Sequence, residues 1–209
     1  MIKIIGVTQR VDYIENYNER RDSLDQNWHL FFSKINYFSI PLPNISSNII
    51  DYLNRLNLNS ILLSGGNSIA SLDPTINDAA PERDAFETAL LSFALNKKLP
   101  VIGICRGMQV INYFLGGKLK KTDNQINTYH KIRKITQNYS LPEKVNSYHK
   151  YVIPLKNISD QLTPLALDDD ENVEAFISEE KKILGLMWHP ERDKPFDQKT
   201  INLISNFLK

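Results

Sequence analysis

The sequence lacks several features that would place it in large classes of proteins. It has one cysteine among 209 residues, so no disulfide can form within the chain, and a reducing, cytoplasmic setting is the default expectation. No apolar run reaches about 18 residues, and the first residues lack a signal-peptide cleavage pattern, so we expect no membrane association. Lys and Arg total 25 against 24 Asp and Glu, and this balance argues against a nucleic-acid partner.

Motifs for metals and nucleotides are also missing. The four histidines, at positions 29, 130, 149 and 189, show no metal-ligand spacing, so we expect no metal. Neither a G-x-G-x-x-G nor a P-loop pattern occurs, so we expect no cofactor. The composition, 42% hydrophobic and 23% charged, is ordinary for a globular protein, and we expect a single domain over residues 1–209.

Apolar runs alternate with amphipathic segments over the first 117 residues. The pattern predicts strands at 2–7, 36–41, 60–64 and 101–104, and helices at 19–34, 45–57 (capped by Asn44), 82–96 and 108–117. After a weakly patterned stretch at 118–150, it predicts strands at 150–154, 172–177 and 183–188 and a last helix opening near Pro195. This order predicts an α/β fold: a mostly parallel central sheet with helices on both faces and a small antiparallel addition.

The sharpest local feature is the segment GICRG at 103–107, between an apolar strand and a helix. It has the form G-x-S-x-G with Cys105 in place of serine, a pattern that holds its central residue on a tight turn at the carboxyl end of a strand. A helix N-terminus and a nearby base favour nucleophilic thiols at such turns. A lone cysteine is more often a buried structural thiol, but the strand and helix on either side favour a nucleophile.

A base and an orienting carboxylate follow the strand at 183–188. In an extended segment, residues two apart project to the same side, so His189 and Glu191 can share a face. Because Cys105 and His189 both follow predicted strand ends, we expect them to meet at one edge of the sheet. His149 is an alternative base, although it has no carboxylate two residues away.

A Gly-Gly turn follows the strand at 60–64. The backbone N–H of Gly66, together with that of Arg106, could face a developing oxyanion and form an oxyanion hole. On its own the signal is weak, because Gly-Gly is more often only a turn.

Together these segments resemble a known family. SGGN, GICRGMQVIN, VNSYH and MWHPE, in this order and spacing, are similar to the class I glutamine amidotransferase-like superfamily, which uses a Cys-His-Glu triad on a flavodoxin-like α/β sheet. The form CRGMQ resembles the free-standing gamma-glutamyl hydrolases of that superfamily. The segment NERRDSLDQNW resembles the hydrolases of capsule phosphoramidate synthesis, which release glutamate from gamma-glutamyl-CDP-amidate.

The resemblance implies that Cys105, His189 and Glu191 hydrolyse a gamma-glutamyl amide of a small-molecule substrate. It also implies substrate contacts from Gln109 and from the loop residues Asn146, Ser147, Tyr148 and His149. Three alternatives stay open: a glutaminase subunit that supplies ammonia to a partner synthetase, a gamma-glutamyl-GABA-type hydrolase, and a non-catalytic protein with a sensor thiol. A homodimer is also left open.

The basic residues around the expected site bear on the leaving group. Arg10 and Arg83 could reach an anionic substrate, although the start of a helix slightly favours a surface charge for Arg83. Arg83, Arg106, His149 and Lys150 together predict a positively charged rim. Such a rim would favour a phosphate-bearing leaving group over a polyamine.

Overall fold

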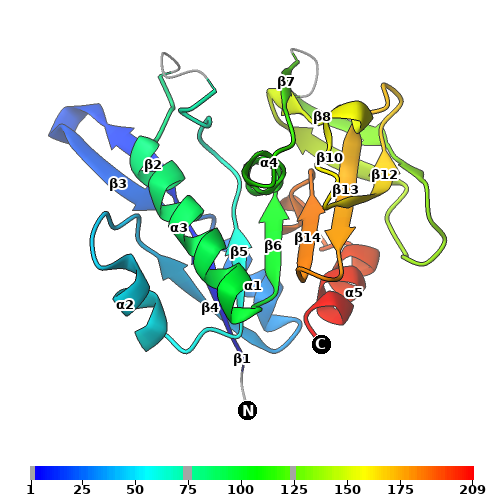
Figure 1. The fold of residues 1–209 in the computed structure, drawn as a ribbon. Helices are drawn as coiled ribbons and strands as arrows, with labels where there is room; N and C mark the ends of the chain where they lie inside the picture. The colour runs from blue at the N-terminus through cyan, green and yellow to red at the C-terminus, as the bar shows by residue number, and fades with distance from the viewer. Residues whose placement is uncertain (1–2, 73–76, 123–125) are drawn as a thin grey trace.

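The computed structural model describes residues 3–72, 77–122 and 126–209. Its main feature is an eight-stranded sheet in the order β4-β1-β5-β6-β14-β13-β12-β9 (Figure 1). Neighbouring strands run parallel among β4 (Tyr37–Leu42), β1 (Lys3–Thr8), β5 (Ser60–Leu63), β6 (Val101–Ile104) and β14 (Ile183–Leu186). Pairing is antiparallel through β13 (Val173–Ser178), β12 (Thr163–Leu167) and β9 (Arg133–Lys134). The predicted sheet with its antiparallel addition is confirmed.

Helices cover both faces of this sheet (Figure 1). Helices α2 (Ile49–Arg55), α3 (Pro81–Lys97) and α4 (Arg106–Phe114) contribute to one apolar cluster, and α1 (Asn27–Ser33) and α5 (Gln198–Phe207) to another. Alternation along β5 sends Ile61 and Leu63 to the first cluster and Leu62 to the second. Burial on both faces explains why the central strands are apolar without a break. No helix in the described part of the chain is long and apolar enough to cross a membrane.

Three small antiparallel pairs extend beyond the main sheet. They are β2 (Arg10–Ile14) with β3 (Glu19–Ser23), β8 (Ile126–Lys131) with β10 (Lys144–Tyr148), and β7 (Lys120–Lys121) with β11 (Tyr151–Val152). Short 3-10 turns lie at η1 (Glu15–Tyr17), η2 (Leu155–Asn157) and η3 (Pro190–Arg192). The weakly patterned stretch 118–150 therefore carries strands on either side of residues 123–125, which lie outside the described residues.

Some predicted elements differ from the observed ones. The segment 19–34 is not one helix, because Glu19–Ser23 pairs with β2 and the helix begins at Asn27. Asn44 does not cap α2: its side-chain amide donates to Asp22 and to the Gln9 carbonyl, and α2 begins at Ile49. The last helix begins three residues after Pro195, at Gln198. The first strand is β1, with residue 2 of the predicted range outside the described residues, and β12 was not predicted.

Candidate functional site

Cys105 occupies the turn between β6 and α4. Its backbone has φ 51° and ψ −107°, a conformation that is rare and strained for a residue with a side chain. Glycines on either side allow this turn. A Cβ at Gly103 would lie 2.6 Å from Ile111 Cδ1, and one at Gly107 would lie 2.1 Å from the carbonyl oxygen of Leu63. The first turn of α4 can pack this closely against the ends of β5 and β6 only because both residues are glycine.

His189 and Glu191 follow β14, the strand next to β6 in the sheet. His189 Nδ1 lies 2.7 Å from Glu191 Oε1, and both side chains are buried. Burial alone would lower the pKa of His189, but the charges of Cys105 and Glu191 outweigh it and raise this pKa to about 9. With Nδ1 directed at Glu191, Nε2 is the ring nitrogen that remains for a thiol. The structure therefore brings together the three residues that the sequence predicted as a triad.

Asn146, in β10, holds the backbone of His189. Its Oδ1 accepts the N–H of His189 at 2.9 Å, and its Nδ2 donates to the His189 carbonyl at 2.9 Å and to Asp193 Oδ1 at 2.9 Å. The side chain is thus engaged within the protein. The neighbouring Tyr148 packs edge-on against the His189 ring, with 5.7 Å between ring centroids, and the Arg192 guanidinium lies 4.2 Å from the centre of the Tyr148 ring.

Three further residues predicted to contact substrate are buried around this core. Gln109 donates from Nε2 to the Tyr151 carbonyl at 2.9 Å, and Ser147 is buried in β10. His149 Nε2 lies 4.0 Å from the buried Glu174 carboxylate, and burial lowers the pKa of His149 to about 4. His149 is therefore neutral at pH 7 and has a more distant carboxylate than His189, which favours His189 as the base. Direct contacts of these residues with substrate stay a prediction.

The loop at 64–67, here named the oxyanion loop, passes beside His189. A Cβ at Gly65 would lie 2.4 Å from His189 Cε1, so a larger residue would displace the imidazole. Gly66 has φ +84°, and a Cβ there would lie 2.9 Å from Arg10 Cδ. The aliphatic part of Arg10 therefore packs on the same loop that the sequence predicted to supply an oxyanion-hole N–H.

The predicted positive rim is wrong for three of its four members. Arg83 has no exposed surface, and its guanidinium donates to backbone and side-chain acceptors of the protein. The Arg106 side chain pairs with Asp84 and Glu87, and His149 is buried and neutral at pH 7. Lys150 is exposed. For Arg83 and Arg106 the prediction failed because acceptors on other elements of the fold bind their guanidinium groups. For His149 it failed because burial removes the charge.

Two cations outside the predicted rim also face solvent. A cavity of about 330 Å³ beside the oxyanion loop is lined by Gly66, His189, Arg10 and Arg192, among others. The side chains of Arg10 and Arg192 are 51% and 34% exposed. Sequence reasoning named Arg10 but missed Arg192, although it directly follows the HPE segment. Among residues 3–72, 77–122 and 126–209, no group of three or more His, Cys, Asp or Glu side chains is arranged to hold a metal ion.

Comparisons with known proteins agree with this architecture. The peptidase C26 family model matches residues 3–143 and 136–191. The chain is 30% identical over 192 residues to gamma-glutamyl-CDP-amidate hydrolase of Campylobacter jejuni, covering 90% of both chains. It is 30% identical over 168 residues to one component of the glutamine-hydrolysing GMP synthase of Methanococcus vannielii, covering 78% of this chain and 81% of the relative.

A solved structure shows the same fold at low sequence identity. The structure of a glutamine amidotransferase from Thermotoga maritima matches with a TM-score of 0.68 and 17% identity, over 100% of this chain and 84% of the other. The sheet order, the turn at Cys105 and the family match over most of the chain lead to one conclusion. The chain belongs to the peptidase C26 family and has the fold of the class I glutamine amidotransferases.

Proposed function

We propose that this protein hydrolyses a gamma-glutamyl amide and releases glutamate, with Cys105 as nucleophile, His189 as general base and acid, and Glu191 as the group that orients the imidazole. The observation that carries the proposal is the 2.7 Å contact between His189 Nδ1 and Glu191, beside a cysteine on a strained strand-to-helix turn. This arrangement is the nucleophile, base and orienter relation on which covalent amide hydrolysis depends.

The reaction would proceed through a thioester. His189 holds the proton of the Cys105 thiol while sulfur attacks the gamma-carbonyl carbon and forms a C–S bond. The oxyanion accepts hydrogen bonds from the N–H groups of Gly66 and Arg106, and one such donor is worth about 3–4 kcal/mol. Collapse breaks the C–N bond, and His189 gives its proton to the leaving nitrogen. Water, deprotonated by His189, then attacks the thioester carbon and forms a C–O bond. The C–S bond breaks, the proton on His189 returns to the Cys105 sulfur, and glutamate is freed.

A phosphate-bearing leaving group fits the mouth of the site. Arg10 and Arg192 line the same cavity as His189 and Gly66, and arginine binds phosphate oxygens in a bidentate manner. The Campylobacter jejuni relative is named for a substrate of this kind, gamma-glutamyl-CDP-amidate. We therefore propose a substrate of that class in capsule polysaccharide modification. The free thiol of Cys105 is the usual state of cysteine in a reducing compartment, and we expect the cytoplasm.

The second candidate is a glutaminase that works as part of a larger enzyme. The relative from Methanococcus vannielii is named as one component of a glutamine-hydrolysing synthase. In that case the leaving nitrogen would be ammonia, and a partner synthetase would receive it. Turnover by the isolated chain separates the two candidates, because a dedicated glutaminase component is expected to work slowly without its partner.

The test compares glutamate release from gamma-glutamyl-CDP-amidate, gamma-glutamyl-GABA and glutamine by the purified chain. We expect Cys105→Ala to abolish release with an unchanged melting temperature. His189→Asn should lose at least about 100-fold, typical of a general base. His149→Asn is the matched control and should lose far less. Full activity in Cys105→Ala, or a large loss confined to His149→Asn, would refute the proposed triad.

The pH profile provides an independent check on His189. With a pKa of about 9, its imidazolium loses the proton needed by the leaving nitrogen as pH rises through that value. Activity should therefore fall on the alkaline side near pH 9. Glu191→Gln removes one of the charges that raise this pKa, so the alkaline limb should move to lower pH. An alkaline limb that stays in place in Glu191→Gln would show that Glu191 does not tune His189.

A further inference from the structure

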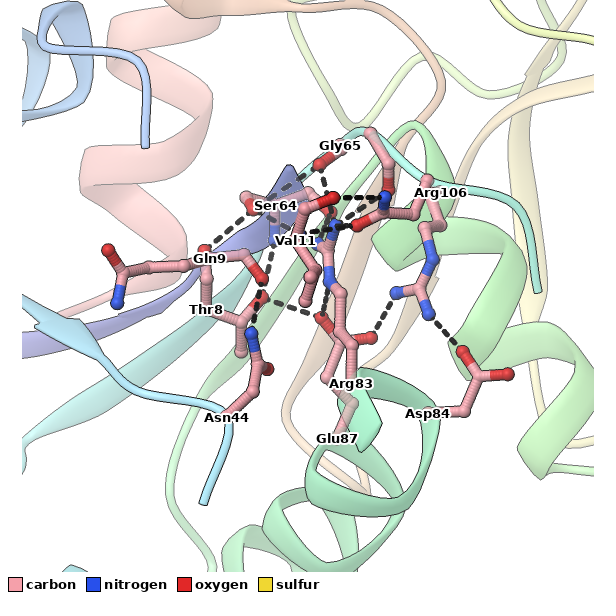
Figure 2. Close-up of polar contacts among 12 residues, drawn as sticks. Thr8, Gln9, Val11, Asn44, Ser64, Gly65, Arg83, Asp84, Glu87 and Arg106 are labelled. Atoms are coloured by element: carbon pink, nitrogen blue, oxygen red, sulfur yellow. Dashed lines mark hydrogen bonds and ion pairs between the residues drawn. The ribbon is translucent and has the colours of Figure 1, made fainter. Parts of the chain in front are cut away.

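Helix α3 carries a buried ion network that the proposed chemistry leaves without a role. The side chains of Arg83, Glu87 and Arg106 are 0%, 0% and 2% exposed. Glu87 Oε1 accepts from Arg83 Nε at 2.8 Å, and Glu87 Oε2 pairs with Arg106. In Figure 2 the Glu87 carboxylate lies between the two guanidinium groups. Buried ion networks are costly to desolvate and are often no more stable than apolar packing, so stability alone does not explain this one.

The guanidinium of Arg83 binds the oxyanion loop from one side. Nη1 donates to the carbonyl oxygens of Gly65 at 3.1 Å and Gly66 at 2.6 Å, and Nη2 donates to the carbonyl oxygen of Ser64 at 2.8 Å. Three successive carbonyl groups thus converge on one cation. Figure 2 shows Ser64 and Gly65 meeting the end of the Arg83 side chain.

This contact sets the direction of the loop N–H groups. In a trans peptide unit, the C=O and N–H bonds point in opposite directions. Because the Gly65 carbonyl points at Arg83, the Gly66 N–H in the same peptide unit points away from it. The loop meets His189 through Gly65 and Arg10 through Gly66. A cation on the carbonyl oxygen also polarises the peptide, which makes its N–H a stronger donor.

The same helix fixes the second predicted donor. The Arg106 side chain pairs with Asp84 and Glu87 on α3, while its backbone begins α4 (Figure 2). Thr8, at the end of β1, completes the network. Its Oγ1 donates to Glu87 Oε1 at 2.7 Å and accepts the Ser64 N–H at 3.0 Å.

We propose that Arg83 and Glu87 are positioning residues that aim the N–H groups of Gly66 and Arg106 at one developing oxyanion. Glu87 holds both guanidinium groups, so the two donors keep a fixed separation while the reaction proceeds. The inference rests on the function proposed above only through Cys105 as the nucleophile. It implies a selective defect: reactions that build negative charge on a carbonyl oxygen are slowed, and other reactions of the same sulfur are not.

Two small probes of Cys105 separate these reactions. p-Nitrophenyl acetate acylates the sulfur: a C–S bond forms through an oxyanion, and p-nitrophenolate leaves with the electron pair of the broken C–O bond. Iodoacetamide alkylates the same sulfur, with iodide leaving and no oxyanion. The ratio of the two rate constants reports the oxyanion hole, and it needs no knowledge of the natural substrate.

The variants are Glu87→Gln, Arg83→Lys and Thr8→Val, each with a melting curve. We expect Glu87→Gln and Arg83→Lys to lower the acylation-to-alkylation ratio at least about 10-fold, since loss of one full donor costs about 100- to 1000-fold. Thr8→Val keeps the side-chain shape and should lower the ratio less. It tests the proposal if the other two variants do not fold. The control is Glu82→Gln on the same helix, whose carboxylate pairs with the exposed Arg20.

An unchanged ratio in the folded variants would overturn the proposal and leave a purely structural network. Equal losses in both rates would also overturn it, because the network would then act on the sulfur. With the natural reaction, the variants should lower kcat and leave KM within about twofold, the pattern of an interaction made only in the transition state. If the variants lower the ratio as expected but the wild type releases glutamate from no gamma-glutamyl amide, the proposed function fails and this inference stands.

Discussion

Two pairs of arginines differ in their burial and in the groups that they contact. Arg83 and Arg106, the inner pair, are buried and bound to Glu87. Arg10 and Arg192, the outer pair, are 51% and 34% exposed and line an open cavity. The inner pair is engaged by the protein itself and can act only through the backbone that it holds. The outer pair is free to exchange its contacts for those of an anion.

The difference shows that charge near a site does not by itself predict ligand binding. Burial lowers the pKa of Arg83 to about 10, against the attraction of Glu87, so it still carries its charge at pH 7. That charge is balanced by a carboxylate and three carbonyl dipoles within the protein. Substitutions in the inner pair should therefore affect stability and turnover, whereas those in the outer pair should affect KM.

The largest expected effect is on stability. Arg83→Met leaves the buried Glu87 without one of its partners, and breaking a buried pair costs about 3–5 kcal/mol. Arg10→Met is a surface change and should stay within about 0.5 kcal/mol. Urea unfolding of both variants measures the two values. Equal losses of unfolding free energy in the two variants would contradict the proposed difference between the inner and outer pairs.

Acid should weaken the inner network in particular. Burial favours the neutral form of Glu87, but Arg106 and Arg83 outweigh this and lower its folded pKa below the ordinary 4.5. A depressed carboxylate pKa contributes stability above the unfolded pKa, and this contribution is lost as pH falls from about 4.5 through the folded value. The slope of unfolding free energy against pH below 4.5 should be shallower in Glu87→Gln, by up to about 1.4 kcal/mol per pH unit. An unchanged slope would show that the pKa of Glu87 is not lowered in the folded protein.

The outer pair should select the leaving group. We expect Arg10→Ala combined with Arg192→Ala to raise KM for gamma-glutamyl-CDP-amidate about 10-fold, because two charge-assisted contacts with phosphate are lost. KM for glutamine should change little, since its leaving group carries no charge. Steady-state kinetics with both substrates provides the comparison. A similar rise for glutamine would mean that these arginines shape the pocket rather than bind phosphate.

The smallest effect is the salt dependence of this preference. Exposed charges are screened over about 8–10 Å at physiological ionic strength. The advantage of the phosphate-bearing substrate over glutamine in kcat/KM should shrink a few-fold between about 0.05 and 0.5 M NaCl. The acylation-to-alkylation ratio of Cys105, which depends on the buried pair, should not change over that range. If both quantities respond alike, the inner pair is more accessible to ions than its burial indicates.

An element can be predicted from the sequence when the interactions that form it lie within one segment of the chain. Local signals were sufficient for β1, β5, β6 and α3, because apolar runs and helical spacing are read within one segment. The prediction of one helix over 19–34 failed because β3 forms by pairing with β2, which is another segment of the chain. The prediction that Asn44 caps a helix failed for a similar reason, because its side-chain amide donates to Asp22 in β3. A single domain and a homodimer stay predictions.

The sequence by itself determined where the reactive groups would meet. Cys105, His189 and the Gly-Gly turn each follow a strand, and the carboxyl ends of parallel strands lie along one edge of a sheet. Only the tertiary structure decided which cations face the substrate. The Arg83–Glu87 pair is visible as an i, i+4 spacing on a helix, but its burial depends on carbonyl groups of the oxyanion loop and on Arg106, all distant in the sequence. The energy of a charge is set by every dipole around it, and those dipoles are assembled only by folding.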